Sequence, residues 1–275
     1  MPLLHLFLVA IVQGLTEFLP VSSSGHLILL PNLTGLNDQG QVIDVAVHVG
    51  TLFAVVLYFW QDVRQALTGL PRLLIGRTDT QGACLALLLL IASVPVIGFG
   101  LILHLTELDS EMRSIKVIGW AMLIFGVVLY WADQIGPSKK QDSDWNLQDA
   151  MVIGVWQAVA LIPGTSRSGI TITGARFLGY ARKDAAKVSM LMSIPTIFAS
   201  GVFLGTEAAM TANMAALRDG LIAALLAFVA ALLALSLMMR LLRSVSFTPY
   251  VISRIVLGVV LLVSASSELT RRLEA

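Results

Sequence analysis

Two stretches of this chain, residues 80–106 and 220–239, contain no formally charged side chain. A helix that spans a bilayer needs about 20 mostly apolar residues, so both stretches are long enough to cross the hydrocarbon core. The composition agrees, because 57% of the 275 residues are hydrophobic, only 13% are charged and the mean hydropathy is +0.85. The sequence therefore predicts an all-α polytopic membrane protein that forms a single membrane domain, 1–275.

The charge balance and the cysteine count exclude several other classes of protein. Lys and Arg number 18 and Asp and Glu number 17, so no basic field exists to attract nucleic acid. The single Cys84 excludes an intrachain disulfide framework and a cluster of thiolate metal ligands. We therefore expect membrane lipid, and not nucleic acid, to surround this chain.

Eight apolar segments divide into six full spans and two broken ones. The six spans are 42–60, 84–104, 115–132, 188–205, 218–240 and 250–267. The segments 3–19 and 149–163 each run into a Ser-rich turn, and a short apolar piece follows at 27–36 and 170–179. Such broken pairs are typical of hairpins that enter and leave the membrane on one side. We therefore predict re-entrant helix hairpins at 3–36 and 149–179.

Lysine and arginine gather in alternate loops, and this asymmetry predicts the orientation, because such loops stay on the cytoplasmic side. Four segments, 61–83, 133–148, 176–187 and 241–249, contain Lys or Arg, whereas 206–217 has neither. The basic residues of these segments and of the adjoining span end are Arg64, Arg72, Arg77, Lys139, Lys140, Arg176, Arg182, Lys183, Lys187, Arg240 and Arg243. With these segments inside, every span alternates and both termini lie outside.

A weak internal repeat accompanies this topology. A shift of 144 residues places Gln13 on Gln157 and the run Ser22–Gly25 on Ser166–Gly169. Each half, 1–132 and 145–275, then contains one re-entrant hairpin and three spans, and an odd number of spans inverts the second half. The two Ser-rich tips are expected to meet within the membrane, where irregular backbone is tolerated only inside protein or along a wet cavity.

The first tip combines an acid, an imidazole and three hydroxyl groups. Gln13 and Glu17 are four residues apart, so both side chains project from one helical face. Pro20 is expected to end that half-helix near the turn. The turn and the next half-helix supply Ser22, Ser23, Ser24 and His26. The simpler alternative is a Ser-rich cap with a buried, paired Glu17, but ionisable groups within a membrane are functional by default.

The second tip places Arg167 between Ser166 and Ser168, with Thr171 one turn further on. A guanidinium at membrane depth is costly without an anion, and its planar fork grips phosphate at two points. Hydroxyl groups and N–H groups at a half-helix start could complete a phosphate cradle. The alternative is an ion pair between Arg167 and Glu17 that only locks the hairpins together, and the two roles can coexist.

Two weaker features allow simpler interpretations. His48 lies early in a span beside Gly50, and we expect it to serve packing or a capped hydrogen bond. Small residues along 196–205 and 220–235 permit close helix packing, either within the chain or between two copies.

These two clusters resemble the motifs of the bacterial undecaprenyl-diphosphate phosphatase family, the bacitracin-resistance membrane phosphatases. That family shows (Glu/Gln)-x-x-x-Glu, then Pro-Val-Ser-Ser-x-Gly-His, and later Pro-Gly-x-Ser-Arg-Ser-Gly-x-Thr. Here the motifs are Gln13 with Glu17, Pro20–His26 and Pro163–Thr171, in the same order. The first position is Gln13, which the pattern allows but which removes a carboxylate, so a scheme with two carboxylates bridging a metal is in doubt here.

The resemblance implies the reaction and its setting. A polyprenyl diphosphate would be hydrolysed to the monophosphate and inorganic phosphate, which recycles the lipid carrier of cell-wall synthesis and confers bacitracin resistance. The enzyme would lie in the bacterial cytoplasmic membrane with its site open to the outer face. A divalent cation, Mg²⁺ or Ca²⁺, is implied, with Glu17 as the one obvious carboxylate ligand nearby. A homodimer is also implied.

The resemblance further implies a role for each residue. Ser23 would be the nucleophile, His26 a general acid or base, and Glu17 an orienting group or base. Arg167 would stabilise the phosphoryl charge. Phosphate-binding groups would come from Gln13, Ser22, Ser24, Ser166, Ser168 and Thr171. The residues leave a water molecule and His26 open as nucleophiles. They also leave open a secondary transporter or flippase for an anionic lipid, which would use the same Arg and helix ends.

Overall fold

The computed structural model describes residues 2–28, 30, 40–108, 112, 114–211 and 213–274. Helices form all the regular elements in these ranges apart from one isolated β-bridge, between Lys140 and Tyr180. Six helices are long and apolar enough to cross a membrane. They are α4 (Gln41–Tyr58), α6 (Gln81–Leu105), α8 (Ile115–Ile135), α11 (Arg182–Thr211), α12 (Met214–Leu241) and α13 (Thr248–Glu274). The six spans predicted from the sequence are thereby confirmed.

Shorter helices lie where the broken segments were predicted. The first is α1 (Leu3–Thr16), and α2 (Ser23–Leu27) follows after a turn. The second pair is α9 (Leu147–Ala158), continued by the 3₁₀ turn η2 (Val159–Leu161), and α10 (Arg167–Phe177). Most of the predicted piece 27–36 lies outside the described residues. α1 ends at Thr16, before Pro20, and the residues from Glu17 to Val21 form the turn.

A further helix, α5 (Trp60–Leu74), occupies much of the basic segment 61–83, which the sequence analysis treated as a loop. It carries Arg64 and Arg72, so it lacks the hydropathy of a span, but it packs along α6. The contact is close because Gly69 faces the backbone of Gly82 and Ala83. α11 likewise begins at Arg182, which extends the predicted span 188–205 by more than a turn. A short 3₁₀ turn, η1 (Asp142–Asp144), precedes α9.

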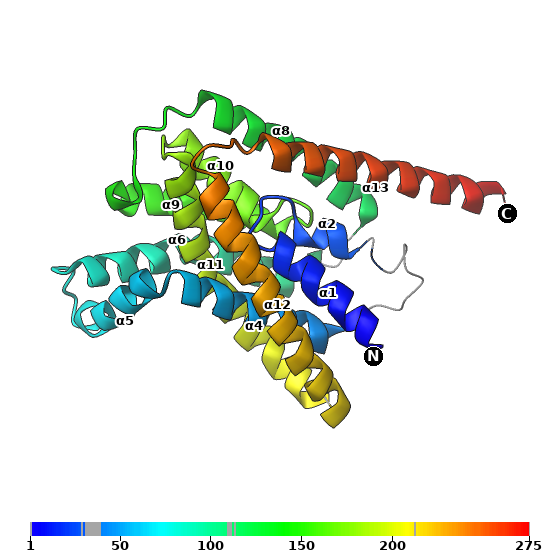
Figure 1. Ribbon diagram of the computed structural model, residues 1–275, viewed down its shortest axis with the longest axis horizontal. Coiled ribbons are helices and arrows are strands. Elements are labelled where there is room, and N and C mark those ends of the chain that lie inside the picture. Colours follow the sequence, from blue (N-terminus) through cyan, green and yellow to red (C-terminus); the bar gives the residue numbers. More distant parts are fainter. Residues whose placement is uncertain are drawn as a thin grey trace.

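Small residues set how closely the helices of the site region approach one another. α12 packs against α4 and α1, while α13 runs along α8 (Figure 1). A Cβ atom on Gly14 would lie 2.6 Å from the Cβ atom of Ala230, so α1 can approach α12 this closely only with glycine there. Gly50 of α4 similarly faces the Ala224 carbonyl oxygen. The alanines of 220–235 that are buried therefore pack within the chain.

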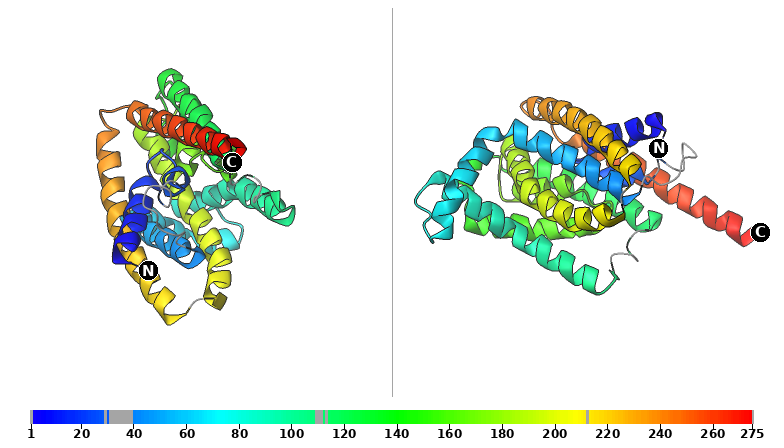
Figure 2. Two further views of the ribbon diagram at one scale, coloured as in Figure 1. Left: turned by 90° about the vertical axis from the view of Figure 1, so that its right-hand side faces the viewer. Right: turned by 90° about the horizontal axis from the view of Figure 1, so that it is seen from below.

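Basic segments gather at one end of the molecule. Figure 1 shows α5, the connection from α8 to α9 and the connection from α12 to α13 at one end. The N-terminus, the end of α13 and the connection from α11 to α12 lie toward the other end, and the views of Figure 2 agree. This grouping is the one that the loop charges predict.

A buried ion-pair network ties the basic end together. The Asp133 carboxylate lies 3.3 Å from Nε of Arg176 and 2.7 Å from Nε of Arg182. Its second oxygen accepts a hydrogen bond from the Phe247 N–H at 3.1 Å. Arg176 also donates to the carbonyl oxygens of Gly136 and Tyr180. Because Arg176 and Asp133 are buried, this network joins α8, α10, α11 and the start of α13.

Candidate active site

The first tip is organised around Glu17, which directly follows α1. The Gln13 Nε2 group donates a hydrogen bond to Glu17 Oε2 at 2.8 Å, so the two side chains share a helical face as predicted. The Ser23 hydroxyl lies 3.4 Å from the same carboxylate oxygen. Glu17 can therefore orient the Ser23 hydroxyl, and it is close enough to accept its proton.

The backbone of this tip is strained at Ser22. Ser22 has φ 73° and ψ 101°, a region that residues with a side chain rarely adopt. It occupies the N-cap position of α2, but its hydroxyl lies 3.1 Å from the Ser24 hydroxyl and caps no helical N–H. The Ser22 carbonyl lies 2.8 Å from His26 Nδ1. If that nitrogen carries the proton, Nε2 of the imidazole is left to accept one.

The second tip has nearly the same local geometry. Ser166 has φ 67° and ψ 112°, and its hydroxyl lies 3.2 Å from the Ser168 hydroxyl. In contrast to Ser22, Ser166 caps its helix, because its hydroxyl accepts a hydrogen bond from the Gly169 N–H at 3.1 Å. α10 thus begins with Arg167 at an ordered N-terminus, which is an environment that favours anions.

Three contacts join the two tips. Arg167 Nη2 lies 3.1 Å from Glu17 Oε1, the Ser168 hydroxyl donates to the Leu19 carbonyl at 3.0 Å, and the Gly164 N–H donates to the Ser24 hydroxyl at 3.3 Å. The ion pair that the sequence analysis weighed as an alternative for Arg167 is therefore present. It brings Arg167, Glu17 and Ser23 into one cluster although the tips lie more than 140 residues apart in the chain.

Unsatisfied polar atoms leave the cluster with binding capacity. Arg167 Nη1 and Gln13 Oε1 are buried and have no hydrogen-bond partner. The side chains of Glu17 and Arg167 are 8% and 14% exposed, whereas Ser23 is half-buried and Ser24 is exposed. A buried guanidinium N–H without an acceptor is costly, so an anion at this point would supply the missing partner.

Four of the predicted phosphate-binding residues, Gln13, Ser22, Ser168 and Thr171, are buried, and the hydroxyl groups of the last two bond within the protein. Thr171 is fully buried, and its hydroxyl contacts the Arg167 carbonyl at 2.8 Å and the Ser189 hydroxyl at 2.6 Å. Ser168 is also fully buried and holds the Leu19 carbonyl. His26 contacts the Ser22 backbone, and within the described part of the chain it lies beyond hydrogen-bonding distance of Glu17 and Ser23.

Two residues at the site were not assigned to it from the sequence. His48 Nδ1 lies 2.7 Å from the Asp44 carbonyl oxygen of the same helix. Its Nε2 in addition lies 3.8 Å from Glu17 Oε2, and its side chain is 39% exposed. The sequence feature that could have assigned His48 to the site is its position inside a span, because titratable residues there are functional by default.

The second missed residue is Arg254, which is fully buried in α13. Its guanidinium contacts main-chain carbonyls, among them Gly164 at 3.3 Å, and Nη1 is without a partner. No described carboxylate lies within ion-pairing distance of it. Arg254 holds the second tip at Gly164, and a lone arginine in the span 250–267 was the signal for it.

The donor set at the tips bears on the implied divalent cation. The described residues contain no group of three or more His, Cys, Asp and Glu side chains that could hold a metal ion. Glu17 is the one carboxylate that contacts both tips, and Arg167 and His48 already face it. Mg²⁺ and Ca²⁺ take six or more oxygen ligands, so these side chains alone do not fit a protein-held cation.

Comparisons with known proteins agree over nearly the whole chain. A model of the family described as bacitracin resistance protein BacA matches residues 6–260. A protein of Jannaschia sp. named undecaprenyl-diphosphatase is 69% identical over 265 residues, which are 96% of this chain and 99% of that protein. Proteins with the same name from Ruegeria pomeroyi and Teredinibacter turnerae are 69% and 44% identical, and the alignments cover 95% and 96% of this chain and 98% and 100% of those proteins.

Proposed function

The chain belongs to the bacitracin resistance protein BacA family, and we propose that it is an undecaprenyl-diphosphatase of the bacterial cytoplasmic membrane. It hydrolyses undecaprenyl diphosphate to undecaprenyl phosphate and inorganic phosphate, which recycles the lipid carrier and confers bacitracin resistance. One observation carries the assignment of the site. Arg167, with a buried and unpartnered N–H group, meets Glu17 and Ser23 where the two tips join.

The proposed role of Arg167 is to bind the terminal phosphate. Its Nη1 group would donate to a phosphoryl oxygen while Nη2 stays near Glu17, and this preorganised charge would stabilise the transition state. Hydroxyl groups of Ser22, Ser24 and Ser166, with the N–H groups that begin α10, are proposed to complete the cradle. Ser168 and Thr171 are buried beneath it, so their hydroxyls would support the cradle from behind.

Ser23 is the proposed nucleophile. Glu17 accepts the proton of the Ser23 hydroxyl as its oxygen attacks the terminal phosphorus in line with the bridging oxygen. The lipid monophosphate leaves, and a water molecule then hydrolyses the phosphoserine. His26 would act as general acid or base near the leaving group. The competing routes are direct attack by water and attack by His26. The Ser23→Ala variant distinguishes both of these routes from attack by the Ser23 hydroxyl.

A divalent cation would be held mainly by the diphosphate, with Glu17 supplying at most one protein oxygen. When bound, the cation would neutralise charge on the phosphates. EDTA should therefore lower phosphate release by the purified enzyme without shifting the thermal unfolding midpoint of the substrate-free protein. A fall of that midpoint in EDTA would instead indicate a cation held by the protein.

The arrangement in the membrane extends the proposal. We infer an inverted repeat of two re-entrant hairpins, supported by the matching backbone angles at Ser22 and Ser166. Both termini and the entrance to the site would face outward, and homodimers would form in the membrane. Cysteines placed at Gln141 and Asn213, with Cys84 removed, should be labelled from the inside and the outside respectively. Labelling of both from one side would contradict this topology.

A carrier of anionic lipids is the rival function, and one assay separates the two. Purified protein in detergent has no second compartment, so a carrier would give no product there. We expect inorganic phosphate to be released from a polyprenyl diphosphate under these conditions. Vectorial uptake into liposomes without cleavage would refute the phosphatase.

A further inference from the structure

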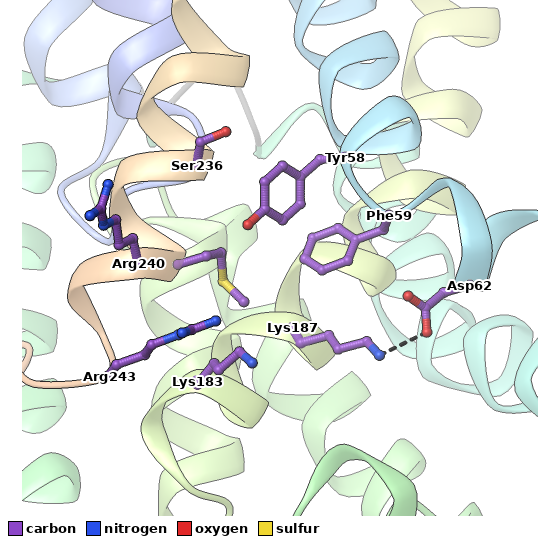
Figure 3. A pocket seen from close by; sticks show the side chains of 9 residues that line it. Tyr58, Phe59, Asp62, Lys183, Lys187, Ser236, Arg240 and Arg243 are labelled. Atoms are coloured by element: carbon purple, nitrogen blue, oxygen red, sulfur yellow. Dashed lines mark ion pairs between the residues drawn. The ribbon is translucent and has the colours of Figure 1, made fainter.

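A second polar pocket lies at the basic end of the molecule, away from the two tips. Its volume is about 520 Å³, and the side chains around it come from α4, α5, α11, α12 and the residues after α12 (Figure 3). They are Tyr58, Phe59, Asp62, Lys183, Lys187, Ser236, Met239, Arg240 and Arg243. Tyr58 lies ten residues beyond His48 on α4, so the pocket is roughly 15 Å along that helix from the site.

The pocket carries a surplus of positive charge. Lys187 is neutralised, because its ammonium group lies 2.8 Å from Asp62 and 2.7 Å from Asp142. Lys183, Arg240 and Arg243 are exposed, and none forms an ion pair with a carboxylate of the described residues. Figure 3 shows Arg243 and Lys183 reaching into the space between α11 and α12, with Tyr58 pointing in from α4. The four cations Lys183, Lys187, Arg240 and Arg243 exceed the two carboxylates that pair with Lys187 by two charges. This net positive charge around one hollow favours an anionic ligand.

An apolar stripe on α12 leads from this pocket toward the middle of the membrane. Ser236 and Arg240 line the pocket, and Val229 and Leu233 precede them at helical spacing on the same face. Val229 and Leu233 are 53% and 64% exposed, and Leu225 one turn earlier is 59% exposed. The helix face thus changes from cationic to apolar along its length, which matches a molecule with an anionic head and a hydrocarbon chain.

We propose that this pocket binds the phosphate headgroup of an anionic phospholipid of the inner leaflet, with an acyl chain along the Leu225–Leu233 stripe. The loop charges place this end on the cytoplasmic side, where anionic lipids attract basic pockets between transmembrane helices. Arg243 and Lys183 would donate to the phosphodiester, and the Tyr58 hydroxyl lies within the same hollow. The proposal is independent of the phosphatase assignment.

The test measures lipid adducts of the purified, delipidated protein by native mass spectrometry. Phosphatidylglycerol is titrated against phosphatidylcholine with identical acyl chains, and inorganic phosphate and glycerol phosphate are added as competitors. The pocket variant combines Lys183→Gln, Arg240→Gln and Arg243→Gln. The matched control combines Arg64→Gln, Arg77→Gln and Lys139→Gln, which removes the same charge from exposed residues of the same end.

We expect phosphatidylglycerol to bind saturably and in preference to phosphatidylcholine. The pocket variant should weaken that binding on the order of tenfold or more, and the control by about twofold or less. If the triple variant does not fold, Arg243→Gln alone should show a smaller loss in the same direction. Equal losses in variant and control would mean diffuse attraction and would overturn the proposal. Full displacement of phosphatidylglycerol by glycerol phosphate would show that the pocket binds a soluble phosphate ester, and this would overturn the proposal of a lipid ligand.

Discussion

The two tips share a backbone geometry but differ in how firmly they are held. Both place a serine at positive φ before a helix, and both pair two serine hydroxyls across two residues. α2 has 5 residues and exposes Ser24, whereas α10 has 11 residues, most of which are buried. Ser166 caps α10, and Ser22 caps nothing in α2. We therefore propose that the first tip presents the groups for chemistry and that the second tip holds Arg167 in a fixed position.

The difference also explains where the polar contacts go. Hydroxyls of the second tip bond to the protein, for example Thr171 to Ser189 and Ser168 to Leu19. The Ser23 hydroxyl of the first tip has a long 3.4 Å contact to Glu17, which leaves it able to move toward a substrate. A catalytic site of this kind needs a reactive group on one side and a rigidly positioned binding group on the other.

The largest effect is expected at the reactive tip. Ser23→Ala removes the proposed nucleophile from a half-buried position, so the fold should survive while phosphate release falls on the order of 10³-fold or more. Release and the thermal unfolding midpoint should be measured on the same preparation. Near-normal turnover in this variant would assign the attack to water or to His26.

Substitutions in the second tip should lower the thermal stability of the protein more than they lower its turnover. Thr171→Val leaves the buried Ser189 hydroxyl without its 2.6 Å partner, at a cost of about 1–3 kcal/mol. We expect a lower unfolding midpoint and a loss of turnover on the order of tenfold or less. Ser189→Ala is the matched control, because it removes the other partner of the same hydrogen bond. It should lower the unfolding midpoint and the turnover by similar amounts. A loss as large as that of Ser23→Ala, at an unchanged midpoint, would mean that Thr171 contacts substrate.

A smaller effect is expected for Gln13, which supports the reactive tip from behind. Gln13→Ala removes a 2.8 Å hydrogen bond that orients Glu17, so turnover should fall by about threefold. Gln13→Glu would place a second carboxylate beside Glu17, and EDTA should then inhibit more strongly if the pair recruits a cation. Equal EDTA sensitivity of Gln13→Glu and the unmodified enzyme would exclude that recruitment.

The smallest effect concerns acid stability at the basic end, far from both tips. Burial raises the pKa of the Asp142 carboxyl, but the hydrogen bonds with Lys187 and Asp184 and the positive charge of Lys187 together outweigh it, so the pKa lies below its ordinary value. A lowered folded-state pKa contributes stability above the unfolded pKa of about 3.9, and this stability is lost as the pH falls through the folded value. Asp142→Asn should therefore lower the unfolding midpoint slightly at pH 7 and by a smaller amount near pH 3. An equal loss at both pH values would contradict this linkage.

The sequence predicted the spans because a run of apolar residues has few alternatives in a bilayer. It predicted Glu17, Ser23 and Arg167 as candidates because polar residues in such runs are costly. It did not place α5, whose Arg64 and Arg72 resemble a loop until Gly69 is seen against α6. It did not assign His48 and Arg254 either, because their partners come from elements distant in the sequence. Helical periodicity carries no information on those contacts.

The central claim is that the ion pair between the tips serves phosphate chemistry and does more than lock the hairpins. It is tested most directly by phosphate release and unfolding midpoints of Glu17→Met, Arg167→Met and the double variant, with Arg167→Lys beside them. We expect both single variants to be inactive and destabilised by an unpaired buried charge, and Arg167→Lys to lose on the order of 10²-fold or more. The double variant should regain stability but no turnover. A double variant that releases phosphate at a rate near that of the unmodified enzyme would contradict the account.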